Sequence, residues 1–105
     1  MKRKDTGRTR AMRESEIEKY FVACVKKLGG YAEKFSSPSR RSVPDRLVTF
    51  PRGRVSFVEL KATGKKPTKA QERDHKRRRK MGFRVFVVDN NEDAYILAEV
   101  LAGNG

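Results

Sequence analysis

Two short runs of strand-forming residues, 45–50 and 54–61, are separated only by Pro51-Arg52-Gly53. Proline and glycine are typical turn residues, so this spacing predicts a hairpin-like turn between two neighbouring strands. Pro44 precedes the first run and disfavours helix at Val43, because a proline restricts the residue before it to extended conformations. The middle of the chain is therefore expected to form part of a β-sheet.

Three charged side chains, Asp45, Glu59 and Lys61, lie on this predicted pair of strands. Glu59 and Lys61 are two residues apart and share one face of their strand, while Leu60 points the other way. Asp45 opens the preceding strand and can lie beside Glu59. Magnesium prefers carboxylate oxygens, and a nearby ammonium can orient a water or stabilise charge on phosphate. Each short motif also occurs in turns and surface charge pairs, but their combination favours a nuclease site.

The composition indicates the kind of partner. The 105 residues fit one domain and carry 26 Lys and Arg against 13 Asp and Glu, a net charge of +13. This charge predicts a nucleic-acid partner, bound through phosphate neutralisation and counterion release. A membrane is a poorer fit, because the basic residues are spread over several segments and no apolar run could span a bilayer. Cys24 is the only cysteine, which excludes a disulfide framework and a cysteine-based zinc site.

The pattern along the chain predicts its organisation. Residues 1–13 are basic and lack apolar periodicity, so we expect a mobile arm ahead of one domain over 14–105. The last strand, 83–88, is apolar except at Arg84 and is expected to be buried on both faces. In all, the pattern predicts helices over 14–28, 68–82 and 92–101, and strands over 31–35, 45–50, 54–61 and 83–88. This order predicts an α/β fold, a small mixed sheet with helices packed on it.

The order of elements and several short motifs resemble the VRR-NUC family, in the small stand-alone form of phages and bacteria. That family belongs to the PD-(D/E)xK nuclease superfamily. The residues that carry the resemblance are Glu14 to Glu18, Gly29-Gly30, Lys34-Phe35, Val43 to Leu47, Phe57 to Lys61, and Gln71. Ser42 departs from the glycine that is common before Val-Pro-Asp, and a serine there should be tolerated. The resemblance implies a restriction-endonuclease-like α-β-β-β-α-β core, with a mixed central sheet flanked by helices.

The resemblance also implies roles for the site residues. Asp45 and Glu59 would bind Mg²⁺ or Mn²⁺, with the main-chain carbonyl of Leu60 as a further oxygen ligand. Lys61 would orient the attacking water or stabilise the transition state. Gln71 would lie near the site at the start of its helix, although the spacing from Thr68 to Gln71 is also that of a helix-capping box.

A glutamate of the first helix would complete such a site, and two candidates remain open. At about 100° per residue, Glu14 falls within the apolar stripe of the helix and Glu18 falls at its edge. Similar junction resolvases carry a glutamate just ahead of an apolar pair, as Glu18 stands to Phe21-Val22. His75, one turn after Gln71, could approach the site, but a lone helical histidine is more often a surface or packing residue, and we assign it no catalytic role.

We predict a metal-dependent, structure-selective DNA endonuclease of the cytoplasm, in a bacterium or a phage-infected cell. Cutting both strands of a Holliday junction needs two sites, which a twofold homodimer would provide. One alternative is a nicking or restriction-like nuclease on linear duplex. Another is a non-catalytic basic nucleic-acid-binding module, although such a module would gain affinity by losing Asp45 and Glu59. The residues predicted to contact DNA are Arg40, Arg41, Lys65, Lys66, Arg77 and Arg78.

Overall fold

The computed structural model describes residues 10–103. Its elements, in chain order, are α1 (Glu14–Lys27), β1 (Tyr31–Lys34), β2 (Arg46–Phe50), β3 (Arg54–Leu60), α2 (Lys69–Lys80), β4 (Arg84–Val88) and α3 (Asn91–Leu101). All the predicted helices and strands are present, and their ends lie within two residues of the predicted ones. Within residues 10–103, no helix combines the length and the apolar character needed to cross a membrane.

The four strands form one mixed sheet in the order β1-β2-β3-β4. Strands β1, β2 and β3 are antiparallel neighbours, and β4 pairs with β3 in parallel after the crossover through α2. The predicted turn at 51–53 joins β2 to β3, with Leu47 opposite Phe57. The predicted α-β-β-β-α-β core is therefore confirmed, and α3 follows it.

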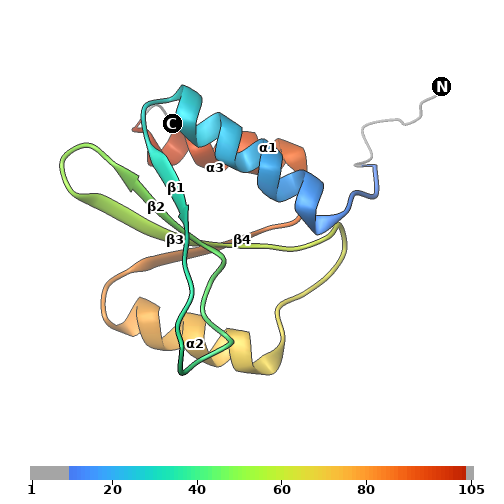
Figure 1. The fold of residues 1–105 in the computed structure, drawn as a ribbon, viewed down its shortest axis with the longest axis vertical. Coiled ribbons are helices and arrows are strands. Elements are labelled where there is room, and N and C mark those ends of the chain that lie inside the picture. Colours follow the sequence, from blue (N-terminus) through green and yellow to red (C-terminus); the bar gives the residue numbers. More distant parts are fainter. Residues whose placement is uncertain (1–9, 104–105) are drawn as a thin grey trace.

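Helices α1 and α3 cover one face of the sheet, and α2 covers the other (Figure 1). The aliphatic core lies on the side of α1 and α3. Because side chains alternate along a strand, every second residue of β3 points into this core. The buried residues of the core are Ile17, Phe21, Val25, Val48, Phe50, Val58, Leu60, Val88, Ala94, Leu97, Ala98 and Leu101. Their spacing of three and four in α1 and α3 is the pattern that predicted these helices.

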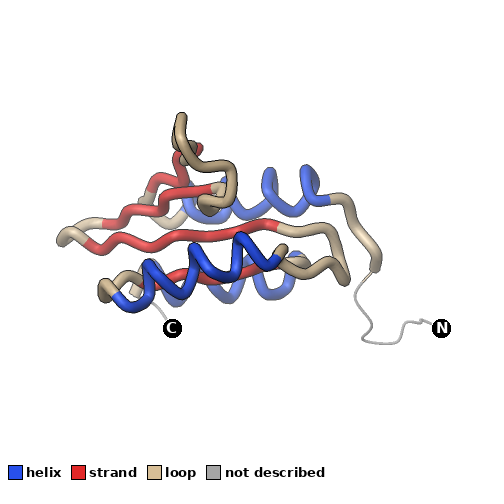
Figure 2. The backbone as a smooth tube through the Cα atoms, turned by 90° about the horizontal axis from the view of Figure 1, so that it is seen from below, coloured by secondary structure: helices blue, strands red, loops and turns tan. Residues whose placement is uncertain are grey.

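The face under α2 is built differently, and Figure 2 views the molecule from this side. The buried residues of α2 are polar, Asp74 and His75. Below them the ring of Phe57 contacts the rings of Phe35 and Phe83, at centroid distances of 5.3 and 5.6 Å. Polar side chains and aromatic rings thus hold α2 on the sheet, in place of an aliphatic stripe.

Two consecutive glycines set the turn from α1 into β1. Gly29 has a φ of +95°, in the left-handed region that favours glycine. Its N–H donates to the oxygen of Lys26, and the N–H of Gly30 donates to the oxygen of Val25, which makes a Schellman motif. A Cβ on Gly30 would lie 2.6 Å from the ring of Phe50. Gly29 is therefore needed for its conformation and Gly30 for its lack of a side chain.

The prediction that the last strand is buried on both faces is wrong. Strand β4 lies at the edge of the sheet. Val85 and Val87 are two residues apart and share the face toward α2, yet Val85 is buried and Val87 is 38% exposed. Helix α2 therefore covers only the beginning of this strand on that face, and an apolar sequence alone did not reveal where the cover ends.

Most of the predicted N-terminal arm, residues 1–9, lies outside the described residues. Its last residues are attached to the loop that follows β3. The N–H of Met12 donates to Oγ1 of Thr63, and the N–H of Thr63 donates to the oxygen of Met12, both at 3.0 Å. The N–H of Arg13 donates to the carboxylate of Glu16, also at 3.0 Å, which caps the start of α1. These bonds fix the beginning of α1 beside the end of β3.

Candidate active site

Asp45 lies just before β2, where the ladder between β2 and β3 ends. Continuing the register of the two strands by two residues places Pro44 opposite Leu60. The N–H of Leu60 donates to Oδ2 of Asp45 at 2.8 Å. Because proline has no N–H, the residue opposite Leu60 cannot donate to the Leu60 carbonyl. The sequence Pro-Asp thus holds the Asp45 carboxylate beside the end of β3 and leaves the Leu60 carbonyl without a ladder donor from Pro44.

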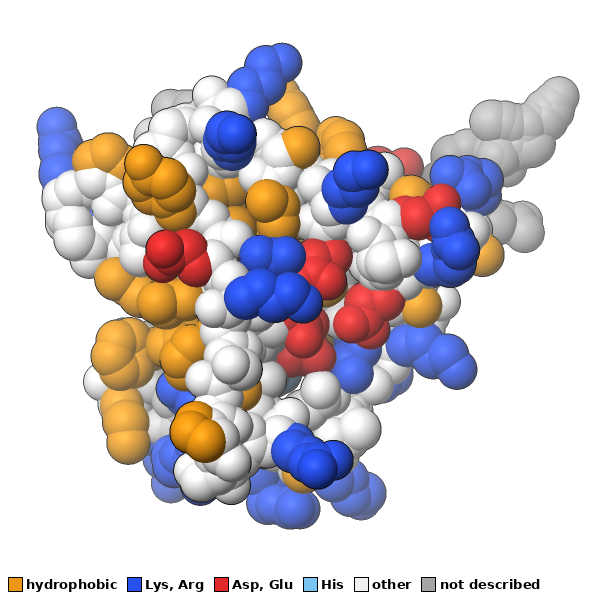
Figure 3. Space-filling model, in the orientation of Figure 1, with side chains coloured by type: hydrophobic (Ala, Val, Ile, Leu, Met, Phe, Trp, Pro, Cys, Tyr) orange, Lys and Arg blue, Asp and Glu red, His pale blue; other side chains and the backbone are white. Residues whose placement is uncertain are grey.

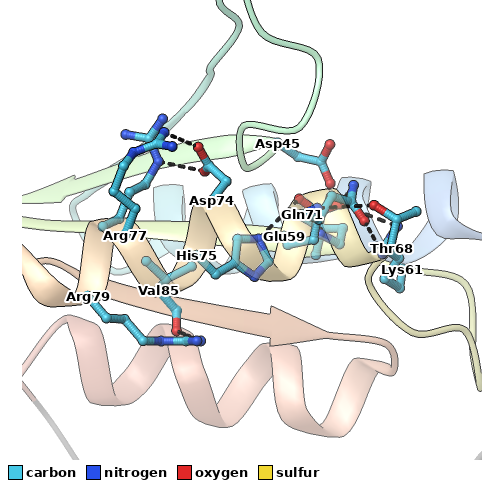
Figure 4. Close-up of polar contacts among 12 residues, drawn as sticks. Asp45, Glu59, Lys61, Thr68, Gln71, Asp74, His75, Arg77, Arg79 and Val85 are labelled. Carbon is cyan, nitrogen blue, oxygen red and sulfur yellow. Dashed lines mark hydrogen bonds and ion pairs between the residues drawn. The ribbon is translucent and has the colours of Figure 1, made fainter.

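Glu59 lies on β3 and is 1% exposed. Its Oε2 accepts a hydrogen bond from Nε2 of Gln71 at 2.9 Å and lies 3.6 Å from Nζ of Lys61. Its Oε1 lies 3.9 Å from Nε2 of His75. Figure 4 shows Glu59 with Lys61, Gln71 and His75 under the first turns of α2. Asp45 acts electrostatically on Glu59 from the end of the neighbouring strand. The structure therefore brings together Asp45, Glu59, Lys61 and Gln71.

Gln71 makes capping contacts within α2 and also donates a hydrogen bond to Glu59. Its N–H donates to Oγ1 of Thr68 at 3.1 Å, and its Oε1 accepts from the N–H of Thr68 at 2.8 Å. This is the predicted capping box. The amide oxygen is thus used in capping the helix, while the amide nitrogen holds Glu59.

The site concentrates negative charge in a buried place. Burial, together with the carboxylates of Asp45 and Glu14, raises the pKa of Glu59 to about 7, although Lys61 opposes the shift. Burial and the Asp45 carboxylate also raise the pKa of Glu14, with Lys61 again opposing. One ammonium therefore does not balance the carboxylates that converge here, and a bound cation would stabilise their ionised forms.

The donor set fits Mg²⁺ or Mn²⁺. Asp45 and Glu59 offer carboxylate oxygens, and Leu60 offers a main-chain carbonyl, all of them hard ligands. Among residues 10–103, no three Asp, Glu, His or Cys side chains meet as a ready-made metal cluster. Magnesium can be bound by one or two carboxylates together with several waters, and Asp45 and Glu59 are the two carboxylates that could hold it here.

The two glutamates of α1 differ in their surroundings. Glu18 is engaged by two cations, with Oε2 at 2.8 Å from Nε of Arg46 and 3.9 Å from Nζ of Lys34. Glu14 interacts electrostatically with Asp45 and Lys61 and, more weakly, with Glu18 and Lys34. The structure thus associates Glu14 with the site and makes Glu18 part of a charge cluster between α1 and the first two strands.

Asp74 and His75 are the buried residues of α2, and the sequence predicted no role for either. His75 is 1% exposed and Asp74 is fully buried. Burial, assisted by the positive charge of Arg79, lowers the pKa of His75, so its imidazole is neutral at neutral pH. The only signal in the sequence was the spacing of four between Gln71 and His75, which places both on one face of α2.

Two of the arginines predicted to bind DNA have internal partners. Nε of Arg78 donates to Asp74 at 2.8 Å, and its guanidinium lies over the rings of Phe35 and Phe57, 5.2 and 4.8 Å from their centroids. Arg77 donates to the other oxygen of Asp74 at 2.6 Å and remains 40% exposed. Arg78 therefore has a packing role in the structure, whereas Arg77 also faces solvent.

The remaining predicted DNA contacts lie on the surface. Arg40 is half exposed, with Nε at 3.8 Å from Asp74. Arg41, Lys65 and Lys66 are exposed. Figure 3 shows Asp and Glu side chains gathered near the centre of one face, with Lys and Arg side chains around them. Such a surface would hold a phosphate backbone around an acidic centre.

The chain is similar to known proteins over most of its length. The chain is 50% identical over 91 residues to "Putative nuclease p44" of Acyrthosiphon pisum secondary endosymbiont phage 1, a match that covers 87% of this chain and 98% of that protein. It is also similar to a solved structure of a VRR-NUC domain, with a TM-score of 0.79 and 40% identity over 85% of this chain and 97% of the other. No model of a known protein family matches the chain. Because both similarities extend over nearly the whole of each relative, the chain belongs to the VRR-NUC family of nucleases.

Proposed function

We propose that this nuclease is a divalent-metal-dependent endonuclease that hydrolyses phosphodiester bonds in DNA. The observation that carries the proposal is the buried Glu59 carboxylate, which lies between Gln71 and Lys61 in the field of Asp45. Burying a carboxylate near other carboxylates costs stability. A bound cation would offset that cost, so metal binding explains why the carboxylate is buried in this place.

The residues of the chain would divide the work as follows. Asp45, Glu59 and the Leu60 carbonyl would hold Mg²⁺ or Mn²⁺, which when bound lowers the pKa of a water and stabilises charge on the phosphate. Lys61 would orient the attacking water or stabilise the charge that develops on the phosphate oxygens. Gln71 would keep the Glu59 carboxylate in place. Glu14 would complete the acidic centre from α1.

The preferred substrate in this proposal is branched DNA, in particular a four-way junction. The chain has abundant positive charge around the acidic centre, and its sequence has no recognised base-reading motif. Charge that contacts phosphates responds to the shape of the DNA more than to its sequence. The name of the related phage protein, "Putative nuclease p44", supports nucleic acid as the substrate class, and the choice of branched DNA rests on the charge of the chain.

Symmetric cutting of a junction would use a homodimer, and the surface formed by β4 and α3 is our candidate for the contact. Val87, Ile96 and Val100 are exposed there and line a hollow of about 300 Å³. Between Asn91 and Leu101, α3 carries three acidic residues and no lysine or arginine, so this surface would not attract DNA. If sedimentation shows a monomer both free and on a junction, the dimeric resolvase is excluded. The alternative of a nicking nuclease then remains.

The test of the main proposal is cleavage of a supercoiled plasmid and of a synthetic four-way junction, with Mg²⁺, with Mn²⁺ and with EDTA. We expect cleavage with either metal and none with EDTA. Preference for the junction separates the resolvase-like activity from nicking of linear duplex. Binding without cleavage under every condition would support the non-catalytic module instead.

A further inference from the structure

Two buried polar atoms face each other across the interface between β3 and α2. Oε1 of Glu59 and Nε2 of His75 are 3.9 Å apart. Neither has a hydrogen-bond partner among residues 10–103. Both side chains are almost fully buried, each about 1% exposed. Buried polar groups without partners destabilise a fold, so such a pair calls for an explanation.

The surroundings of the pair restrict what can reach these atoms. On one side, Oε2 of the same carboxylate is already engaged by Gln71 and Lys61. On the other, the capping box of Thr68 and Gln71 orders the start of α2, and Nε2 of Gln71 ties that start to Glu59 on β3. His75 follows Gln71 by one helical turn and lies on the same face. A movement of about 1 Å would bring its Nε2 within ordinary hydrogen-bonding distance of Oε1.

We propose that His75 is a positioning residue for Glu59, and that it donates a hydrogen bond from Nε2–H to Oε1 when the site binds a divalent cation. This inference rests on the proposed metal-dependent activity. A carboxylate has about four acceptor positions, so donors at His75 and Gln71 leave room for a cation. Residues that hydrogen-bond to metal ligands fix their orientation and thereby raise metal affinity.

A packing role is the competing explanation, and the two roles differ in what they require of the side chain. Packing requires a group of the right volume, whereas positioning requires a donor at the place of Nε2. Glutamine reaches that place with its amide nitrogen. Asparagine is shorter and carries its amide near the place of Nδ1. Leucine has a similar volume to histidine and has no donor.

The experiment measures Mn²⁺ binding without DNA, through the rise of the melting temperature as Mn²⁺ is added, for His75→Gln, His75→Asn and His75→Leu. The Mg²⁺ concentration for half-maximal junction cleavage is measured alongside. We expect His75→Leu and His75→Asn to need about 10- to 100-fold more metal in both measurements. His75→Gln should remain near the wild type. Leu101→Ala, a core variant on the far face of the sheet, is the control for lost stability alone.

The outcomes are distinct. If His75→Leu and His75→Asn bind Mn²⁺ like the wild type, whatever their melting temperature in EDTA, His75 only packs and the inference fails. If His75→Leu does not fold, the comparison of the glutamine and asparagine variants decides. If the wild type itself neither binds Mn²⁺ nor cleaves DNA, the proposed function fails, and this result is distinguishable from the failure of the His75 role.

Discussion

The N–H of Leu60 donates to Oδ2 of Asp45 at 2.8 Å, at the place where Pro44 would otherwise continue the ladder between β2 and β3. A side chain thus takes over the hydrogen bond that the main chain of a regular strand pair would accept. This side-chain hydrogen bond fixes one oxygen of Asp45. The regular hydrogen bonding between β2 and β3 ends here, so oxygen atoms at the end of β3 are available to a ligand. The Pro-Asp pair is therefore a geometric requirement of the site as well as a source of charge.

Removal of either carboxylate or of the ammonium should stop catalysis and spare binding. Asp45→Asn and Glu59→Gln remove a charged oxygen ligand, and Lys61→Ala removes the ammonium beside Glu59. We expect each to lower the cleavage rate by at least about 100-fold. Junction affinity in a gel-shift assay should change little, because it comes from the basic surface. Full activity of Asp45→Asn in EDTA would contradict the metal-nuclease proposal.

Substitution of the two glutamates of α1 should affect different properties, the cleavage rate for Glu14 and the melting temperature for Glu18. Glu14→Gln removes a charge that acts on Asp45 and Glu59, so we expect slower cleavage with an almost unchanged melting temperature. Glu18→Gln breaks the contacts to Arg46 and Lys34, so we expect a lower melting temperature and a smaller effect on the rate. The reverse pattern would make Glu18 the residue that completes the site.

The raised pKa of Glu59 predicts how stability depends on pH in the absence of metal. Its usual pKa is about 4.5 and its folded value is about 7, so between these values the folded protein holds a proton that the unfolded chain has released. Stability should therefore fall as pH rises from about 4.5 to 7, by about 3 kcal/mol at most from this group.

Urea unfolding in EDTA checks this dependence, with Glu59→Gln as the reference because its side chain does not titrate. The stability of the wild type relative to Glu59→Gln should be highest at pH values below about 4.5 and should fall as the pH rises to about 7. Adding Mn²⁺ should reverse the trend, because the metal binds the ionised carboxylate. A constant difference across this range would show that Glu59 titrates normally.

Most of the basic residues predicted to contact DNA should contribute to DNA affinity, whereas Arg78 should contribute to the stability of the fold. Arg41→Ala, Lys65→Ala and Lys66→Ala remove exposed charges, so together they should weaken binding to every DNA sequence alike. The slope of log affinity against log salt should flatten by about one unit for each lost phosphate contact. Melting temperature should hardly change.

Arg78→Ala is the matched comparison. It removes a partner of the buried Asp74 and a guanidinium that lies over two aromatic rings. We expect it to destabilise the protein by about 1–3 kcal/mol, even though Arg77 still pairs with Asp74. An unchanged stability with a flatter salt slope would instead make Arg78 a DNA contact.

The sequence predicted the parts of this fold that depend on local signals. Regular spacing such as Ile17, Phe21 and Val25 reveals a helix face, and Gly29 and the 51–53 turn mark where elements end. The strands of the hairpin placed Asp45 beside the end of β3. These predictions required only the geometry of a strand and of a helix.

The parts that sequence did not predict depend on which element covers which. Helix α2 has no aliphatic stripe, so its buried Asp74 and His75 could not be told from the exposed residues around them. The pairing of Glu18 with Arg46 joins α1 to β2 and could not be read from the sequence. The exposure of Val87 depended on how far α2 extends over β4. Each of these is a tertiary relationship that overrides local pattern.

Some of the groups that hold helix α2 on the sheet also belong to the candidate active site. An aliphatic stripe would keep a helix docked whatever happened to a nearby carboxylate. Here Gln71 donates a hydrogen bond to Glu59 and His75 lies beside the same carboxylate. Asp74 accepts hydrogen bonds from Arg77 and Arg78 of its own helix. Release of α2 from the sheet and loss of the contacts that Glu59 makes with Gln71 and His75 should then occur together, as a single equilibrium. Hydrogen exchange of the α2 amides would thus serve as a reporter of the Glu59 carboxylate, slowing when the site is occupied and quickening when Glu59 loses its partners.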